Sequence, residues 1–182
     1  PLRAAIGLGR GLGWCALHLA GRRRHIAEVN LALCLPSLHA SERKQLVARN
    51  FTHMGVGLVE AAIAWLNPAR PIYPRCTIRG LEHLEQARQL GRGVLLIGAH
   101  FTCIDIVSQA MSRAGEVDVM YRENKNPVWE WLQVRGRRHY FEGVVERDDV
   151  RQALRSLKSG RTLWYAADQD YGRKHSVFAP FF

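Results

Sequence analysis

The chain has 182 residues, of which 47% are hydrophobic and 23% are charged. This composition excludes an intrinsically disordered chain, and the length suffices for one compact domain with a hydrophobic core. Lys and Arg number 26 against 16 Asp and Glu, and the net charge of +10 favours partners that carry phosphate or acidic groups. Nucleic acid, anionic lipid and an acidic protein all meet that requirement, although a solvated surface explains any single basic cluster equally well.

The four cysteines do not form a recognisable site. They stand at Cys15, Cys34, Cys76 and Cys103, and no two of them have CxxC spacing. Neither a disulfide framework nor a zinc site is therefore predicted. Free thiols in a reducing compartment fit this pattern best.

The first 21 residues alternate glycine with apolar residues. They do not form a GxGxxG motif, and no GK[ST] sequence follows, so a nucleotide-binding loop is not predicted. We interpret the segment as a glycine-rich helix or a membrane-contacting segment. Residues 11–21 are uncharged but shorter than the roughly 20 residues needed to span a bilayer, so no transmembrane helix is expected within the chain.

A basic run at 22–24 opens the next predicted helix, which Pro36 ends. Apolar residues at Ile26, Val29 and Leu33 follow the three arginines. Apolar sequence beside a basic run is typical of a membrane interface, where arginines meet lipid phosphates.

A long helix is predicted after Ser41, which can cap it, with Glu42 in its first turn. An apolar stripe at steps of three and four residues favours a face packed against a core. Its members are Val47, Phe51, Met54, Leu58, Ala61 and Trp65. A proline-containing linker then ends a helical, membrane-proximal segment that we assign to residues 1–74.

Residues 75–182 are predicted to form an α/β domain. Short apolar runs predict strands, and intervening amphipathic stretches predict helices. The predicted strands are 94–97, 117–121, 144–145 and 162–166, and the predicted helices are 104–113, 127–138 and 149–160. Regular alternation of this kind predicts a largely parallel or mixed sheet flanked by helices. The unbroken apolar run at 94–97 predicts a strand buried on both faces.

Two groups of polar residues follow predicted strands. His100 ends the first strand and Asp105 follows five residues later. If His100 lies on the turn, Asp105 can hold its imidazole so that the other ring nitrogen takes a proton from a hydroxyl group. The spacing alone is a weak signal, and a structural histidine explains it equally well.

The second polar group, 168–172, follows the fourth strand. It begins with Asp168, Gln169 and Asp170, and Arg173 and Lys174 add positive charge nearby. Carboxyl ends of parallel strands are where ligands bind in open α/β sheets, so these residues are candidates for a site. An ordinary Asp/Gly turn accounts for them equally well.

Taken together, these motifs resemble the lipid A biosynthesis lauroyl/myristoyl acyltransferase family. The block DQDYG at 168–172 with the tail VFAPFF at 177–182 is more specific than the His-x4-Asp pair. The stretches that carry the resemblance are 22–36, 78–93, 91–105, 120–138 and 163–182, in the family's order.

The resemblance implies a mechanism. A His-x4-acid dyad, here His100 and Asp105, activates a hydroxyl on a lipid A precursor, which attacks the thioester of an acyl carrier protein. By the same resemblance, the family's oxyanion-stabilising arginine falls at Arg137, and Asp168 matches a further functional position. Arg122 is a candidate for phosphate contact. No metal or cofactor is implied beyond the acyl carrier protein thioester as co-substrate.

The resemblance also implies partners and a location. Acyl carrier protein, a lipid A precursor and the anionic inner membrane are expected partners, at the cytoplasmic face of that membrane, and nucleic acid is not expected. Asp170, Arg173 and Lys174 are further candidates for substrate binding. The family's N-terminal membrane helix is absent and the family continues past Phe182. We therefore expect the chain to be part of a longer protein and residues 1–182 alone to be inactive and poorly soluble.

Two other functions remain as alternatives. A glycerolipid acyltransferase shares the His-x4-Asp dyad but carries a Pro-Glu-Gly-Thr-like block where this chain has DQDYG. A basic nucleic-acid-binding module interleaves arginine with exposed aromatic residues. Trp129, Trp131 and Arg135 imitate that pattern locally, but their spacing also fits a helix lying on a core or a membrane.

Overall fold

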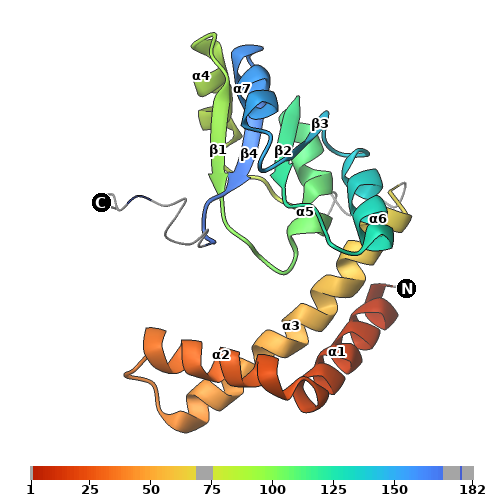
Figure 1. The fold of residues 1–182 in the computed structure, drawn as a ribbon, viewed down its shortest axis with the longest axis vertical. Helices are drawn as coiled ribbons and strands as arrows, with labels where there is room; N and C mark the ends of the chain where they lie inside the picture. Colours follow the sequence, from red (N-terminus) through yellow and green to blue (C-terminus); the bar gives the residue numbers. More distant parts are fainter. Residues whose placement is uncertain (1, 69–75, 170–176, 178–182) are drawn as a thin grey trace. The chain divides into compact units, whose positions relative to one another are not determined.

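The computed structural model describes residues 2–68, 76–169 and 177 (Figure 1). The chain divides into two compact units. One comprises Pro1–Cys76 with Thr102–Ala110, and the other Thr77–Phe101 with Met111–Phe182. The first unit contains the helices α1 (Leu2–Leu19), α2 (Gly21–Cys34) and α3 (Ala40–Leu66), together with most of α5 (Ile104–Met111). None of the helices that the structure describes is both long and apolar enough to cross a membrane.

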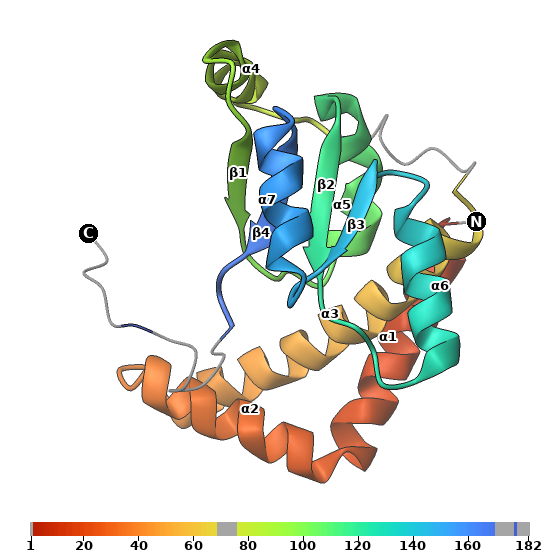
Figure 2. The same cartoon turned by 45° about the horizontal axis from the view of Figure 1, so that its top comes forward.

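Glycines allow α1 and α3 to pack with their backbones in contact. A Cβ atom on Gly9 would lie 2.6 Å from Val56 Cα, and one on Gly13 would lie 2.8 Å from Thr52 Cα. Figures 1 and 2 show the two helices side by side along much of their length. Gly9 and Gly13 therefore serve helix packing, because only a residue without a side chain fits at these two positions.

Substituting alanine for two glycines of α1 is expected to change stability in opposite directions. Gly13→Ala should lower the free energy of unfolding by about 1–3 kcal/mol, because the new methyl group meets α3 backbone that cannot yield. Gly11→Ala, with no heavy atom within 4 Å, should raise it by up to about 1 kcal/mol through better helix propensity. Urea unfolding of the two variants measures both values, and equal effects would contradict this packing.

The cap of α3 differs from the predicted one. The helix begins after His39 rather than Ser41, and the His39 backbone N–H donates to Glu42 Oε2 at 2.8 Å. Glu42 thus gives the His39 backbone N–H a hydrogen-bond acceptor, a role that the sequence analysis did not predict for it. In the predicted apolar stripe Val47 and Phe51 are buried, as expected, whereas Met54 and Leu58 are exposed.

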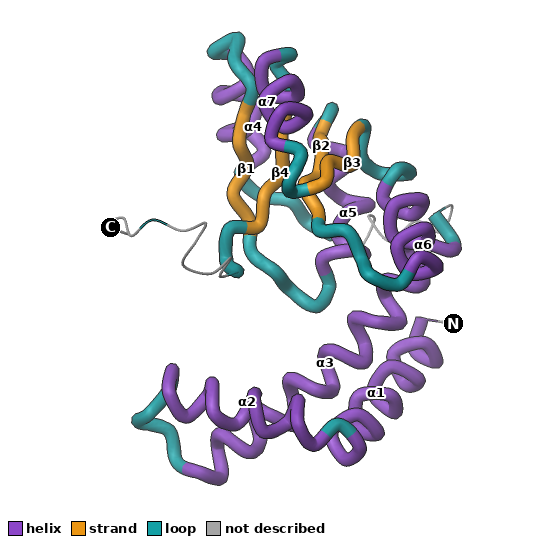
Figure 3. The backbone as a smooth tube through the Cα atoms, viewed as in Figure 1, coloured by secondary structure: helices purple, strands orange, loops and turns teal. Residues whose placement is uncertain are grey.

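The second unit contains a four-stranded parallel sheet, which confirms the predicted α/β class. Its strands are β1 (Val94–Gly98), β2 (Val117–Tyr121), β3 (Gly143–Glu146) and β4 (Thr162–Ala166), in the order β1-β4-β2-β3 (Figure 3). In the register of the sheet, Gly98 of β1 lies opposite Ala166 of β4, and Tyr121 of β2 lies opposite Glu146 of β3. All four carboxyl ends therefore lie at one edge.

Helices cover the two faces of this sheet with separate apolar clusters. On one face Val145 and Leu163 pack against Ala153 and Leu157 of α7 (Val150–Lys158), which Figure 2 shows lying across β4. On the other face the core includes Val117, Val119 and Phe141, with Leu84 of α4 (Leu81–Gln89) packed against it. The helix α6 (Pro127–Arg137) follows β2, and the Asn126 side chain caps it by accepting from Val128 N and Trp129 N.

The prediction that the first strand is buried on both faces is wrong. Side chains of β1 alternate between half-buried and exposed, with Leu95 49% and Ile97 59% exposed. In the described part of the chain β1 is the outer strand of the sheet, and α7 packs against β3 and β4. An apolar run alone does not reveal whether both faces of a strand are covered.

At the amino edge of the sheet, the buried carboxylate of Asp118 is held by hydrogen-bond donors. Asp118 accepts hydrogen bonds from the Ser156 hydroxyl and, at 3.4 Å, from Arg161 Nη1. Arg88 of α4 donates to the Thr162 hydroxyl at 3.1 Å. Because a buried carboxylate needs such partners, we interpret this network as one that holds the strands and helices in register.

Candidate active site

The carboxyl edge of the parallel sheet gathers polar side chains from all four strands. His100 follows β1, Arg122 follows β2, Arg147 follows β3 and Asp168 follows β4. In open α/β sheets this edge is where ligands bind. The structure therefore places two of the predicted catalytic residues, His100 and Asp168, at the ends of neighbouring strands.

His100 and Asp168 form a two-point contact. Asp168 Oδ2 accepts from the His100 backbone N–H at 2.8 Å, and Asp168 Oδ1 lies 2.7 Å from His100 Nδ1. The contact continues the ladder between β1 and β4, since Ala167 N donates to Gly98 O at 3.3 Å just before it. The carboxylate thus fixes both the backbone and the ring of His100.

This contact determines which nitrogen of His100 can act as a base. An ionised carboxylate only accepts hydrogen bonds, so Nδ1 carries the proton that it shares with Asp168. In the neutral ring Nε2 then has a free lone pair, and the His100 side chain is 46% exposed. The arrangement suits a general base that takes a proton from a bound hydroxyl group, with the carboxylate stabilising the imidazolium that forms.

The backbone N–H of His100, followed by its imidazole, lowers the pKa of the Asp168 carboxyl below its ordinary value of 3.8. A lowered pKa means that the stabilisation is fully present above the ordinary value and is lost as the pH falls through the lowered one. We expect the Asp168 carboxyl carbon to titrate in NMR with a midpoint below 3.8, and to move back towards 3.8 in His100→Ala. A wild-type midpoint above 3.8 would contradict the contact.

Gly98 permits the packing beneath this turn. A Cβ atom at this position would lie 2.5 Å from Nε1 of Trp164, whose ring belongs to the core on that face of the sheet. A rigid indole cannot yield as a flexible side chain would. Glycine at 98 therefore lets β1 pack closely against Trp164, which positions His100 two residues later.

Asp105 lies near the start of α5, in the other compact unit. Its Oδ1 accepts a hydrogen bond from Trp65 Nε1 of α3 at 3.2 Å. The sequence analysis placed Trp65 in the apolar stripe of the long helix because of its spacing. That spacing does not reveal the hydrogen bond that its indole donates. The pairing of His100 with Asp105 stays a prediction, whereas the pairing of His100 with Asp168 is present in the structure.

The structure describes some of the remaining candidate residues and not others. Arg137 is the half-buried last residue of α6, and Arg122 is exposed directly after β2. Asp170, Arg173 and Lys174 lie outside the described residues. Among residues 2–68, 76–169 and 177, no group of three or more His, Cys, Asp or Glu side chains is placed to hold a metal ion.

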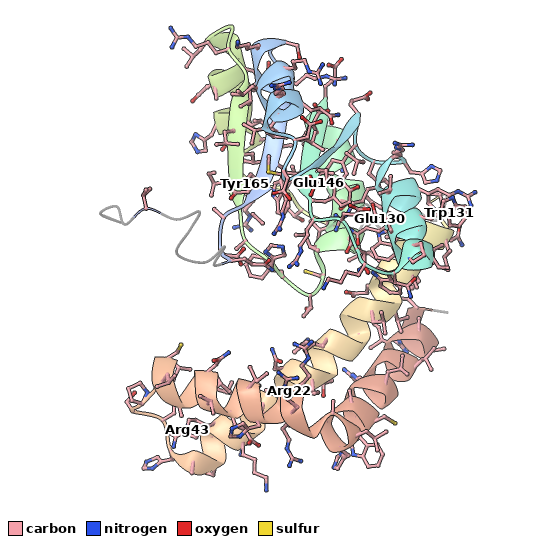
Figure 4. All side chains as sticks on the ribbon, viewed as in Figure 1. Arg22, Arg43, Glu130, Trp131, Glu146 and Tyr165 are labelled. Carbon is pink, nitrogen blue, oxygen red and sulfur yellow. The ribbon has the colours of Figure 1, made fainter. Side chains whose placement is uncertain are left out.

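The loop between β2 and α6 is held by Glu130. This carboxylate accepts from the Tyr121 hydroxyl at 2.7 Å and from Asn124 N at 2.8 Å. Burial, and then the hydrogen bond to Glu130, raises the pKa of Tyr121 to about 12, so the phenol stays a donor. Glu130, labelled on α6 in Figure 4, thereby ties α6, which ends at Arg137, to the strand that precedes Arg122.

Comparison with known proteins assigns the chain to a family. Residues 1–182 match the family described as bacterial lipid A biosynthesis acyltransferase. The lauroyltransferase of lipid A biosynthesis from Escherichia coli is 38% identical over 182 residues, which cover 100% of this chain and 60% of the relative.

Two further Escherichia coli relatives, both named as acyltransferases of lipid A biosynthesis, also match the chain. The palmitoleoyltransferase is 38% identical over a match that covers 96% of this chain and 57% of the relative. The myristoyltransferase is 29% identical over a match that covers 94% of this chain and 54% of the relative. The chain thus spans somewhat more than half the length of the curated relatives that it matches. These matches confirm the resemblance found in the sequence, and the chain belongs to the bacterial lipid A biosynthesis acyltransferase family.

Proposed function

We propose that the complete protein transfers a fatty acyl group from acyl carrier protein to a hydroxyl of a lipid A precursor, with His100 as the general base. The observation that carries the proposal is the two-point contact of Asp168 with His100, which leaves Nε2 of an exposed imidazole free to accept a proton. Family membership supports the reaction class, since the relatives are lipid A acyltransferases by name.

In the proposed reaction Nε2 of His100 takes the proton of the acceptor hydroxyl as its oxygen attacks the thioester carbonyl carbon. The tetrahedral intermediate carries an oxyanion, and by resemblance Arg137 is the cation that stabilises it. The C–S bond then breaks, an ester remains on the acceptor, and the departing thiolate takes the proton from the imidazolium. Asp168, ionised throughout, stabilises the imidazolium between the two proton transfers.

The assay that tests this function uses the complete protein with a lipid A precursor and a panel of acyl carrier protein thioesters of different chain lengths. Transfer of one acyl group per acceptor, with free acyl carrier protein as the second product, is the expected result. A lysophospholipid acceptor in parallel distinguishes the glycerolipid alternative. Transfer to the lysophospholipid and none to the lipid A precursor would overturn the proposal.

We place the protein at the cytoplasmic face of the inner membrane, with α2 contacting anionic lipid. The arginines at 22–24 are exposed, and α2, described along its whole length, has no buried residue. Its apolar residues Ile26, Val29 and Leu33 are also exposed. Exposed apolar side chains beside a run of arginines suit the boundary between lipid headgroups and acyl chains.

Replacing the three arginines at 22–24 with glutamine should weaken binding to anionic vesicles by about 100-fold at low salt. Each basic residue near such a surface contributes about 1 kcal/mol, and salt screens the attraction. Vesicle sedimentation with and without anionic lipid measures the effect. The matched control changes Arg151, Arg155 and Lys158 of α7 to glutamine, which removes the same charge elsewhere. Equal binding by both triple variants would show that the 22–24 run is only a solvated surface.

A further inference from the structure

The outward face of α7 carries three basic side chains in a row. Arg151, Arg155 and Lys158 are four and three residues apart, so at about 100° per residue they lie within about 60° of one another around the helix axis. The two buried residues of α7, Ala153 and Ser156, lie on the opposite side of the helix. The three bases, which we call the α7 basic row, therefore point away from the sheet, and all three are exposed.

The stability of the helix does not explain this row. Like charges three or four residues apart destabilise a helix, whereas bases in the last turn interact favourably with the helix dipole. The dipole accounts for Arg155 and Lys158, which lie in the last turn, but not for Arg151, which lies in the first. α7 also has no acidic residue of its own, whereas α4 and α6 each carry glutamate.

Acidic side chains lie near both ends of α7, and each has another partner. Before the helix, Asp149 Oδ1 accepts from Gln152 N at 2.9 Å, and Asp148 Oδ1 lies 3.5 Å from Arg147 Nε. Glu146 Oε2 accepts from Asp148 N at 2.7 Å. Counted with Arg147, these three acids leave two net negative charges before the helix, so the row is most positive at its other end.

At the carboxyl end of α7 the nearby charges cancel. Glu116 Oε2 lies 3.7 Å from Arg161 Nε, and Arg161 follows the helix by three residues. Within the described ranges, no carboxylate forms an ion pair with any member of the α7 basic row. Arg155 and Lys158 therefore present uncompensated positive charge to a partner.

We propose that the α7 basic row is the docking surface for the donor, acyl carrier protein. The inference rests on the proposed function, which names the donor, and adds the surface that receives it. Acyl carrier protein is acidic, and three exposed cations along about 10 Å of helix match a row of carboxylates on such a partner. Complementary charges of this kind steer association and fix the register of the complex.

The position of α7 suits a donor that must reach the catalytic edge of the sheet. The helix begins four residues after Glu146, where β3 ends, and it packs across β4, whose neighbour β1 precedes His100 (Figure 2). All of these elements belong to the same compact unit. Nine helical residues span only about 13 Å, so a carrier docked on the row can present its thioester, which sits on a flexible arm, to His100.

A membrane is a less suitable partner for α7 than for α2. A helix that binds lipid turns its apolar face to the acyl chains. The apolar face of α7, with Ala153 and Leu157, packs against the sheet, whereas α2 has no buried residue. The exposed side chains of Val150 and Leu154 only flank the row, and the excess of acid before α7 repels an anionic bilayer.

The test measures binding of labelled acyl carrier protein, without acceptor lipid, to the complete protein in nanodiscs of uncharged lipid. Arg151→Gln, Arg155→Gln and Lys158→Gln combined should weaken binding about tenfold or more, mainly through slower association, since each exposed ion pair contributes up to about fivefold. Asp148→Asn should strengthen binding, because it removes an anion beside the row. Added salt should slow association of the wild type more steeply than that of the triple variant.

The matched control carries glutamine at 22–24, which removes the same charge from the other compact unit. It should bind acyl carrier protein as the wild type does but lose affinity for anionic vesicles, whereas the α7 triple variant should do the reverse. In the acyltransfer assay the α7 variant should raise KM for the acyl carrier protein thioester and leave KM for the lipid A precursor unchanged.

The outcomes separate the docking surface from the reaction. Carrier binding that depends on the α7 basic row supports the surface even if the protein transfers no acyl group, in which case only the proposed function fails. Wild-type carrier affinity in the α7 variant would overturn the inference, and the proposed function would stand if transfer is observed. Equal losses in both triple variants would also overturn it, because attraction would then follow total charge. So would loss of vesicle binding by the α7 variant with carrier binding unchanged, since α7 would then contact lipid.

Discussion

An enzyme carrying His100→Ala is expected to transfer acyl groups about 10²–10⁴-fold more slowly than the wild type. Alanine removes the only group that the proposed reaction uses to take the acceptor's proton. Because the loss is in the chemical step, kcat should fall while the KM values for both substrates change little. Steady-state kinetics of the complete protein with saturating thioester donor measures the two parameters separately.

A structural role for His100 would give a different result. Both partners of the His100–Asp168 contact are more than a third exposed, so its loss should destabilise the fold only slightly. His139→Ala removes another exposed histidine and serves as the control. If His100→Ala retains kcat within a few-fold of wild type, or loses activity only in step with unfolding, His100 is not the base.

Asp168→Asn should lower kcat by about 10³–10⁴-fold. The carboxylate accepts from both the backbone N–H and Nδ1 of His100, whereas an amide has one acceptor oxygen for these two donors. If that oxygen keeps the backbone N–H, the amide nitrogen donates to Nδ1 and the ring proton moves to Nε2. The base is then lost, as in a serine-protease triad, where the equivalent change costs about 10⁴-fold.

Asp105→Asn provides the comparison that separates the two carboxylates. The family resemblance predicts that this change is severe, because it assigns Asp105 to the imidazole. The contact seen in the structure predicts that Asp168→Asn is severe, and Glu142→Gln, at an exposed carboxylate, controls for the loss of a negative charge. Near-wild-type turnover by Asp168→Asn, together with an inactive Asp105→Asn, would show that Asp168 only shapes the turn.

Strands were the most predictable part of the fold. The run at 94–97 and the segments 117–121 and 162–166 are short, apolar and bounded by turn residues, and each is a strand in the structure. The helix Leu81–Gln89 was not predicted, because its sequence, LEHLEQARQ, is mostly polar and its apolar stripe is reduced to two leucines and an alanine. Local sequence thus sufficed for elements with a strong pattern and failed where the pattern was weak.

The site was only partly predictable, because its central contact depends on strand order. His100 and Asp168 each followed a predicted strand, but they are 68 residues apart, and no local signal reveals that the fourth strand lies beside the first. Arg147, at the carboxyl edge of the sheet, follows a strand of four residues, and no motif in the sequence singled it out.

The protonation of the two ring nitrogens of His100 tests the central claim most directly. Nitrogen-15 NMR of the complete protein, labelled at histidine and assigned with the His100→Ala variant, distinguishes a protonated from an unprotonated ring nitrogen. We predict that the neutral ring of the wild type carries its proton on Nδ1 and that Asp168→Asn moves it to Nε2. A wild-type ring protonated on Nε2 would have no lone pair facing a substrate and would contradict the assignment of His100 as the base.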